Sequence, residues 1–139
     1  MDFHYINTND GYREMDTYKT WLNLGYAFTN GQQRYGAKLG TLQPGDLVFM
    51  YVSGKGIKAV GMVIKEWDGI EYRQPIISSS SANNEFRIQV NWFIVPPDDF
   101  VPSSKVKEIM GYDFVQTCAR VNKRGAAEKL LRYMLQMLE

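Results

Sequence analysis

A run of six apolar residues most constrains how this chain can fold. Leu47 to Val52 follows Pro44-Gly45-Asp46, a strong turn signal, and has the length of one strand. A strand with no polar side must be covered on both faces, so the run predicts a central strand with other elements above and below it. The next segment, Ile57 to Trp67, is apolar at both odd and even positions, which predicts a second strand of the same kind.

The rest of the chain predicts strands in the middle and helices towards the ends. The expected strands are Phe3 to Asn7, Phe86 to Ile94, which alternates clearly, and Phe114 to Val121. Four helices are expected: from Asp16 or Thr17 to Gly25, around Tyr35 to Leu42, from Ser103 or Ser104 to Met110, and from Asn122 along the stripe Ala127, Leu130, Leu131, Met134, Leu135 and Leu138. This order predicts one α+β domain over residues 1–139, with a curled, largely antiparallel sheet.

Several loops punctuate these elements. Asn9-Asp10-Gly11 and Asn30-Gly31 are turn signals, and Phe28 is expected in a loop. The serine-rich stretch from Ile77 to Asn84 is expected to be a mobile surface loop, and it is a candidate for a lid over a binding site. Asp46 is expected to fix its turn by accepting backbone N–H bonds.

The composition excludes several classes of site. The chain has one Cys, Cys118, and one His, His4, which excludes a disulfide framework and metal sites built from Cys or His clusters. Neither a P-loop nor a GxGxxG motif is present, so no cofactor is expected. The N-terminus does not read as a signal peptide and no apolar run approaches the ~20 residues of a membrane span. We therefore expect a cytoplasmic protein with no membrane partner.

Charge is distributed unevenly along a chain whose net charge is only +1. Residues 31–65 hold five basic residues and one acid, and residues 101–139 hold seven basic residues and four acids. Basic residues interleaved with aromatics, which make up 14% of the chain, suit a surface that holds phosphates and stacks a base. The same pattern also fits a solvated surface over core aromatics, and both readings stay open.

Three stretches of the sequence carry a family resemblance. They are Trp21 to Gly31, Leu42 to Gly54, and Val60-Gly61-Met62-Val63. The middle stretch matches the pattern Leu-x-x-Gly-Asp-x-Val-x-x-Tyr-x-Ser-Gly, and the last matches Val-Gly-x-Val. Together they resemble the EVE branch of the PUA-like superfamily, whose relatives include the YTH domains. The match covers roughly the first half of the chain, and it departs from the family at His4-Tyr5, where the family has Tyr-Trp.

The resemblance implies a PUA-like curled mixed β-barrel flanked by helices, with a pocket that takes a modified base flipped out of a nucleic-acid strand. We expect six residues to bind the base: Asn7, Trp21, Phe28, Asn30, Tyr51 and Ser53. We expect four basic residues to contact phosphates: Arg34, Lys55, Lys58 and Arg120. The expected partner is DNA or RNA carrying a modified base, with a separate nuclease as a further expected partner if the chain serves as a specificity module.

Two other classes of function stay open. The expected architecture also resembles that of the ASCH group of PUA-like proteins. A ribonuclease of that kind would need a proton-transfer pair, for which Lys55 and Tyr51 are the candidates. A small-nucleotide-binding or protein-interaction module is the other alternative. The lack of paired acids or a His cluster favours a non-catalytic reader over an enzyme.

Overall fold

The computed structural model describes residues 1–8, 16–77 and 84–138 of the chain. The expected turn at Asn9-Asp10-Gly11 and most of the serine-rich loop lie outside these ranges. The strands are β1 (Phe3–Asn7), β2 (Tyr26–Thr29), β3 (Leu47–Val52), β4 (Gly56–Val63), β5 (Phe86–Ile94), β6 (Val101–Pro102) and β7 (Cys118–Val121). The helices are α1 (Thr17–Leu24), α2 (Gln33–Leu39), α3 (Ser103–Met110) and α4 (Arg124–Gln136). None of the helices within these ranges is long and apolar enough to cross a bilayer.

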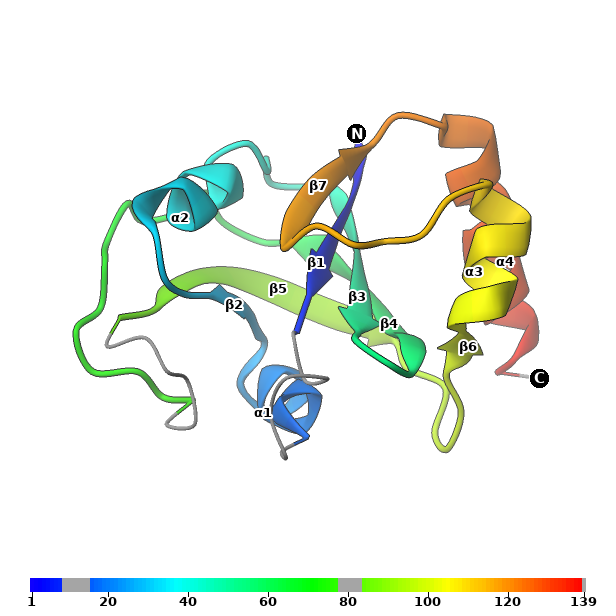
Figure 1. The fold of residues 1–139 in the computed structure, drawn as a ribbon, viewed down its shortest axis with the longest axis horizontal. Coiled ribbons are helices and arrows are strands. Elements are labelled where there is room, and N and C mark those ends of the chain that lie inside the picture. The colour runs from blue at the N-terminus through cyan, green and yellow to red at the C-terminus, as the bar shows by residue number, and fades with distance from the viewer. Residues whose placement is uncertain (9–15, 78–83, 139) are drawn as a thin grey trace.

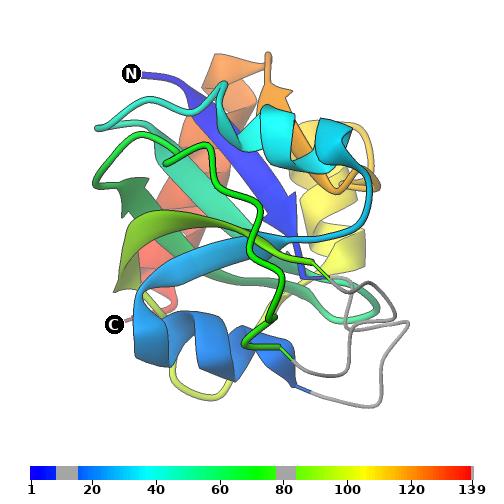
Figure 2. The ribbon, with the colours of Figure 1, turned by 90° about the vertical axis from the view of Figure 1, so that its left-hand side faces the viewer.

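The strands form one curled, mixed sheet in the order β2-β5-β4-β3-β1-β7, with the short β6 beside β4. Only β1 and β3 pair in parallel among the described strands, and every other pairing is antiparallel. Figures 1 and 2 show the sheet bending into a half-barrel, with α2 lying close to β7. The expected α+β class and the largely antiparallel, curled sheet are therefore confirmed.

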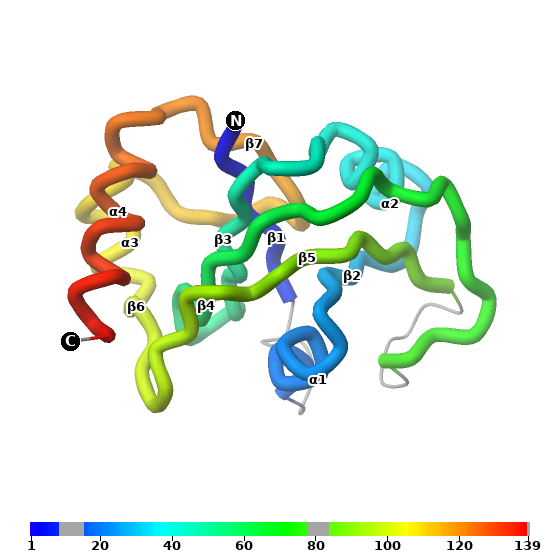
Figure 3. The backbone as a smooth tube through the Cα atoms, turned by 180° about the vertical axis from the view of Figure 1, so that it is seen from behind, coloured from blue at the N-terminus to red at the C-terminus, as the bar shows by residue number. Residues whose placement is uncertain are grey.

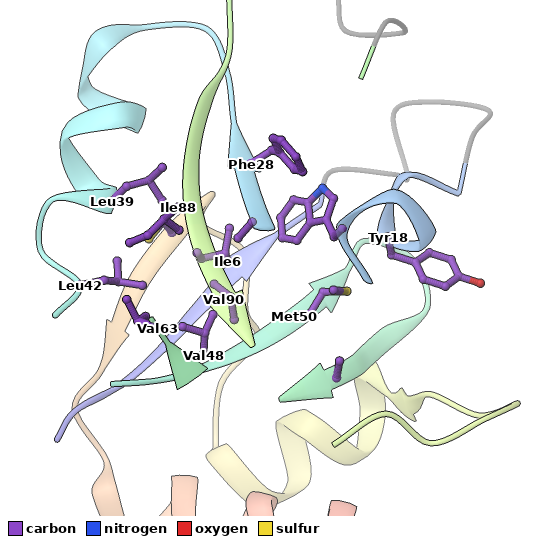
Figure 4. Close-up of a cluster of buried hydrophobic side chains, with 14 of the residues drawn as sticks. Ile6, Tyr18, Phe28, Leu39, Leu42, Val48, Met50, Val63, Ile88 and Val90 are labelled. Carbon is purple, nitrogen blue, oxygen red and sulfur yellow. The ribbon is translucent and has the colours of Figure 1, made fainter. Parts of the chain in front are cut away.

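Both faces of the sheet are covered, as the apolar run predicted. Every residue of β3 is buried, and its side chains alternate between two hydrophobic clusters. Val48, Met50 and Val52 belong to the inner cluster, which α1 and α2 cover. Leu47, Phe49 and Tyr51 belong to the outer cluster, which α3 and α4 cover. Figure 4 shows part of the inner cluster, and Figure 3 shows α3 and α4 together at the far side of the sheet.

Several expected elements differ from those observed. The strand expected from Ile57 to Trp67 is β4 (Gly56–Val63), which ends four residues earlier. Phe28 lies in β2 and not in a loop, because residues 26–29 pair antiparallel with β5 at a distance in sequence that local pattern cannot reveal. The strand expected at 114–121 is reduced to β7, because Phe114 turns into the outer cluster and stacks on Tyr5, with ring centroids 4.1 Å apart. Along α4 the apolar stripe is buried at Ala127, Leu130 and Met134, whereas Leu135 and Leu138 are exposed.

Asp46 ties the start of β3 to the start of β1. Its carboxylate accepts hydrogen bonds from the backbone N–H of Asp2 (2.9 Å) and of Gln43 (3.0 Å), and it lies 2.9 Å from Nε2 of His4. The expected turn-fixing role of Asp46 is thus confirmed, and the bond to His4 extends it. Burial by itself raises the pKa of Asp46, but the hydrogen bonds from Asp2, Gln43 and His4 outweigh burial and hold the pKa below its ordinary value.

Replacing this carboxylate tests how far the fold depends on it. Hydrogen bonds to a charged group contribute about 1.5–3 kcal/mol each, so Asp46→Asn is expected to lower the free energy of unfolding by roughly 2–3 kcal/mol near neutral pH. Because the pKa of Asp46 falls below 3.8 on folding, its contribution is complete above that pH and is lost as the pH drops through the folded-state value. Urea unfolding at a series of pH values measures both effects. A difference between the two proteins that stays constant into strong acid would contradict this assignment.

Candidate nucleic-acid interface

An aromatic cluster lies where α1, β2 and β5 meet. We call Trp21, Phe28 and Trp92 the aromatic cluster. The ring of Trp21 stacks on Trp92, with centroids 6.3 Å apart and planes 28° apart, and it meets Phe28 at 6.0 Å and 59°. Trp21 is 1% exposed and Phe28 is 4% exposed. Two of the residues expected to bind a base, Trp21 and Phe28, are therefore in direct contact.

The indole N–H of Trp21 is the unusual polar group of this cluster. It is buried, and no acceptor for it lies among the residues that the structure describes. The corresponding N–H of Trp92 donates to the backbone oxygen of Tyr26 at 3.2 Å. A buried donor without an acceptor costs about 1–3 kcal/mol, and such groups are rare in folded proteins. The cluster thus contains a donor that a ligand acceptor would satisfy.

A polar loop follows β2 beside the cluster and contains Asn30 and Gly31. Asn7 ends β1 and is buried, but it pairs with Tyr51 and follows the inward-facing Ile6, so its side chain points to the outer face and the structure does not bring it to the cluster as expected. Gly31 is held by Asn84, whose side-chain oxygen accepts from the Gly31 N–H (3.0 Å) and whose amide donates to the Gly31 oxygen (2.7 Å). This reciprocal pair fixes the loop that contains Asn30 to the start of β5. Sequence analysis missed Asn84, because the β2–β5 pairing that brings it to Gly31 leaves no local signal.

Tyr51 lies on the opposite face of the sheet from the aromatic cluster. Its ring packs edge-on against Phe114, with centroids 5.9 Å apart, and its hydroxyl lies 2.9 Å from Oγ of Ser103 on α3. Since side chains alternate along β3, Tyr51 points outward where Met50 and Val52 point inward. The structure therefore does not bring Tyr51 together with Trp21 and Phe28. Tyr51 is removed from the set of residues expected to bind the base. Ser53 follows β3 in the turn and is half-buried.

The same geometry separates the two residues that a ribonuclease was expected to use. The hydroxyl of Tyr51 contacts α3, whereas Nζ of Lys55 lies 3.3 Å from Oδ1 of Asp16, at the start of α1. Lys55 also lies over the rings of Tyr18 and Phe100, 5.5 Å from each centroid. Lys55 and Tyr51 are thus engaged on opposite sides of the sheet, and the pair on which the ribonuclease alternative rested is not assembled.

Lys58 is a second correction. Its side chain was expected to contact phosphates, but the residue is 5% exposed and its ammonium donates to three backbone oxygens: Pro96 (2.6 Å), Pro97 (3.3 Å) and Asp99 (3.3 Å). Burial lowers the pKa of Lys58, although Asp98 and Asp99 oppose this effect. Lys58 therefore holds the loop between β5 and β6, because each of its three donors already has an acceptor.

The other basic residues expected to contact phosphates reach the surface at three places. Arg34 is exposed on α2, where its guanidinium lies 4.9 Å from the ring centroid of Tyr35. Lys55 lies in the turn between β3 and β4, beside α1. Arg120 lies on β7, with a guanidinium nitrogen 3.3 Å from Oδ1 of Asp2. Each side chain is accessible to a phosphate, and whether it binds one stays a prediction.

The aromatic cluster is closed in this conformation. A base held between two rings needs about 7 Å between parallel planes, because each aromatic contact takes about 3.5 Å. The rings of Trp21 and Phe28 are 6.0 Å apart and tilted by 59°. A base must therefore displace one of these rings.

One group of possible metal ligands occurs in the described ranges. Ligand atoms of Asp2, His4 and Asp46 all lie within 4.8 Å of one another. The oxygens of Asp46 already accept two backbone N–H groups and lie against His4. We interpret this group as the structural tie between β1 and β3. Cys118 is buried beside it, and burial raises the pKa of its thiol to about 12, which confirms the expectation that it packs as a small hydrophobic residue.

Comparison with solved structures identifies the fold. No protein-family model matches the sequence, and no curated protein matches it either. The YTH domain of Zygosaccharomyces rouxii MRB1, in complex with N6-methyladenosine RNA, is similar with a TM-score of 0.63 and 12% identity, over 96% of this chain and 86% of that one. The Pho92 YTH domain, in complex with m6A, has a TM-score of 0.67 and 11% identity, over 96% and 85% of the two chains.

Human THYN1, in complex with DNA that contains 5-methylcytosine, has a TM-score of 0.55 and 10% identity, over 96% of this chain and 98% of that one. Identities this low establish the fold alone. The chain has the PUA-like fold, an α+β architecture with a curled mixed half-barrel flanked by helices, as expected.

Two lysines of the β3–β4 hairpin provide a matched test of the corrected assignment. Lys58→Met removes the donor to three buried carbonyls, so we expect the free energy of unfolding to fall by about 1–3 kcal/mol with no loss of affinity for nucleic acid. Lys55→Met removes an exposed charge, so we expect little change in stability and weaker binding at low salt. Chemical denaturation and fluorescence anisotropy measure the two quantities. Weaker binding by a folded Lys58→Met protein would restore the original assignment.

Proposed function

We propose that this protein is a non-catalytic reader of a modified base in DNA or RNA, and that the base is bound at the aromatic cluster. The observation that carries the proposal is the position of Trp21 and Phe28: they lie side by side at the end of a PUA-like half-barrel, next to the loop in which Asn30 follows β2. Aromatic rings beside amide side chains can stack a base and also recognise its edge.

Each residue has a distinct part in this proposal. The ring of Trp21 or Phe28 stacks on the base, and the indole N–H of Trp21 donates to an acceptor on it. We assign recognition of the remaining edge to the amide side chain of Asn30. The Asn84–Gly31 hydrogen bonds hold the loop of Asn30 in place, so that less order has to be gained on binding.

The energies are compatible with this mode of binding. Extruding a base costs a few kcal/mol, and stacking on an aromatic ring returns about 1–3 kcal/mol. Contacts between basic residues and phosphates supply the rest, independently of sequence. Lys55, beside α1, and Arg34, at the start of α2, lie on elements adjacent to the cluster and are the phosphate contacts that we propose there.

The comparisons support this class of ligand. Solved structures that share the fold hold RNA with N6-methyladenosine or DNA with 5-methylcytosine. Both modifications add one methyl group to a base, so a small added group suits a pocket formed largely by apolar rings. The Leu42 to Gly54 motif further supports the proposal that the chain belongs to the EVE branch of the superfamily. A role as the specificity module of a separate nuclease is a further part of the proposal.

The direct test compares modified and plain oligonucleotides of the same sequence. Fluorescence anisotropy with single strands carrying N6-methyladenosine or 5-methylcytosine, each against its unmodified counterpart, gives the preference as a ratio of Kd values. We expect a preference for one modified strand, with affinity for both strands falling as salt is raised, because phosphate contacts release counterions. Equal affinities for every pair, or a flat salt response, would contradict the proposal.

The indole N–H of Trp21 can be tested separately from its ring. Trp21→Phe keeps an aromatic face but removes the donor, so we expect the preference for the modified strand to fall by roughly threefold to tenfold, the value of one hydrogen bond. Trp67→Phe is the matched control, because Trp67 also has a buried N–H with no acceptor in the described ranges and packs on Phe86 instead. Equal losses in the two variants would show a general packing effect and not recognition.

A further inference from the structure

A polar hollow of about 500 Å³ lies between α2 and β7, near the start of β1. Lys38 and Thr41 line it from α2 and the turn after it, and Gln116, Arg120 and Asn122 line it from β7 and its flanks. Its volume lies in the range of small-ligand sites. β7 is the last strand of the sheet, and Figures 1 and 2 show α2 lying beside it.

The hollow is lined by two cations, Lys38 and Arg120, and by one acid, Asp2. Nζ of Lys38 donates to the amide oxygen of Gln116 at 3.3 Å, which leaves its charge without a counter-charge in that bond. Arg120 is paired with Asp2 at 3.3 Å, but both side chains are largely exposed, and such surface pairs contribute little. A phosphate arriving here would exchange weak contacts for charge-assisted hydrogen bonds to both cations.

The inner wall of the hollow is polar as well. His4 lines it, although the residue is only 1% exposed. Its Nε2 is held by Asp46, and its Nδ1 is buried with no hydrogen-bond partner in the part of the chain that the structure describes. In the neutral ring this nitrogen is an acceptor while Nε2–H faces Asp46, so a phosphate in the hollow would be held by Lys38 and Arg120 and not by His4.

Arg34 and Lys38 lie on α2, between the Asn30-Gly31 loop and this hollow. Arg34 and Lys38 are four residues apart on α2 and so lie on the same face of the helix, about 6 Å apart along its axis. The helix begins just after the Asn30-Gly31 loop and ends beside the hollow. Gly36 lies directly against the ring of Phe86, where a Cβ would come within 2.4 Å, so α2 is packed closely on β5 and its position is fixed.

We propose that the hollow between α2 and β7 binds a backbone phosphate of the same strand whose base enters the aromatic cluster, with Lys38 and Arg120 as its ligands and the strand running along α2 past Arg34. This inference rests on the proposed function, and it predicts the direction in which the strand leaves the aromatic cluster. The spacing of Arg34 and Lys38 along the helix, about 6 Å, is close to the distance between neighbouring phosphates of one strand.

The test uses Lys38→Ala, Arg120→Ala and the double variant, with Lys129→Ala as the matched control on α4, across the sheet from the hollow. Anisotropy titrations over a range of salt are made with modified and plain strands. Removal of one cation that binds a phosphate is expected to reduce the slope of log affinity against log salt by about 0.7. The ratio of affinities for modified and plain strands is expected to stay unchanged, because phosphate contacts position a strand without specifying its sequence.

The outcomes separate this inference from the proposed function. A reduced slope in the Lys38 and Arg120 variants, with the wild-type slope in Lys129→Ala, supports the path along α2. Unchanged slopes in the first two variants, or an equal reduction in Lys129→Ala, overturns it, even where the wild-type protein prefers the modified strand. If the slopes are reduced but the wild-type protein shows no preference for the modified strand, phosphate binding along α2 is supported and recognition of a modified base is contradicted.

Competition by inorganic phosphate and by a mononucleotide distinguishes the two sources of a phosphate group. Chemical shifts of the backbone amides of residues 38 and 120 report occupancy of the hollow. We expect both competitors to act only at concentrations far above those of the strand, because a strand gains from its other contacts. Binding of free phosphate as tightly as the strand would overturn the assignment to a nucleic-acid backbone.

Discussion

The parallel pairing of β1 with β3 is the constraint on which the rest of the structure depends. A parallel pair between strands so far apart in sequence has no tight turn to set its register, and here Asp46 sets it by binding the backbone of Asp2 and the ring of His4 at the start of both strands. The register then places Ile6 in the inner cluster and Asn7 opposite Tyr51. The positions of Ile6 and Asn7 relative to β3 therefore depend on this carboxylate.

Much of the fold could be predicted because its signals are local. A fully apolar strand length at Leu47 to Val52, alternation along Phe86 to Ile94, and Gly25 as a helix stop all act through neighbouring residues. Gly25 is in the left-handed conformation at φ 73°, and its N–H bonds to the oxygen of Trp21, as a helix-terminating glycine does. β2 was missed because its four residues become a strand only through pairing with β5.

The candidate site was less predictable, because a motif gives the positions of residues but not the face to which they point. Trp21 and Phe28 were expected together and are in contact. Tyr51 belongs to the same matched stretch as the turn at Asp46, yet alternation along β3 directs it to the outer cluster. Lys58 shows the same limit for charge: a lysine in a basic segment was expected at the surface, whereas the backbone oxygens of Pro96, Pro97 and Asp99 bind its ammonium.

The two ends of β1 explain how one small domain can combine recognition with affinity. His4 and Asn7 are three residues apart, about 10 Å along the strand, so a single nucleic-acid strand is long enough to contact both ends. The inward-facing Ile6, next to Asn7, packs in the same cluster as Trp21 and Phe28, the rings that we propose stack the base. The end at His4 offers Lys38 and Arg120, which attract any phosphate. Because sites separated by this distance contribute additively, selection could change the base that is read without changing the contacts to the backbone.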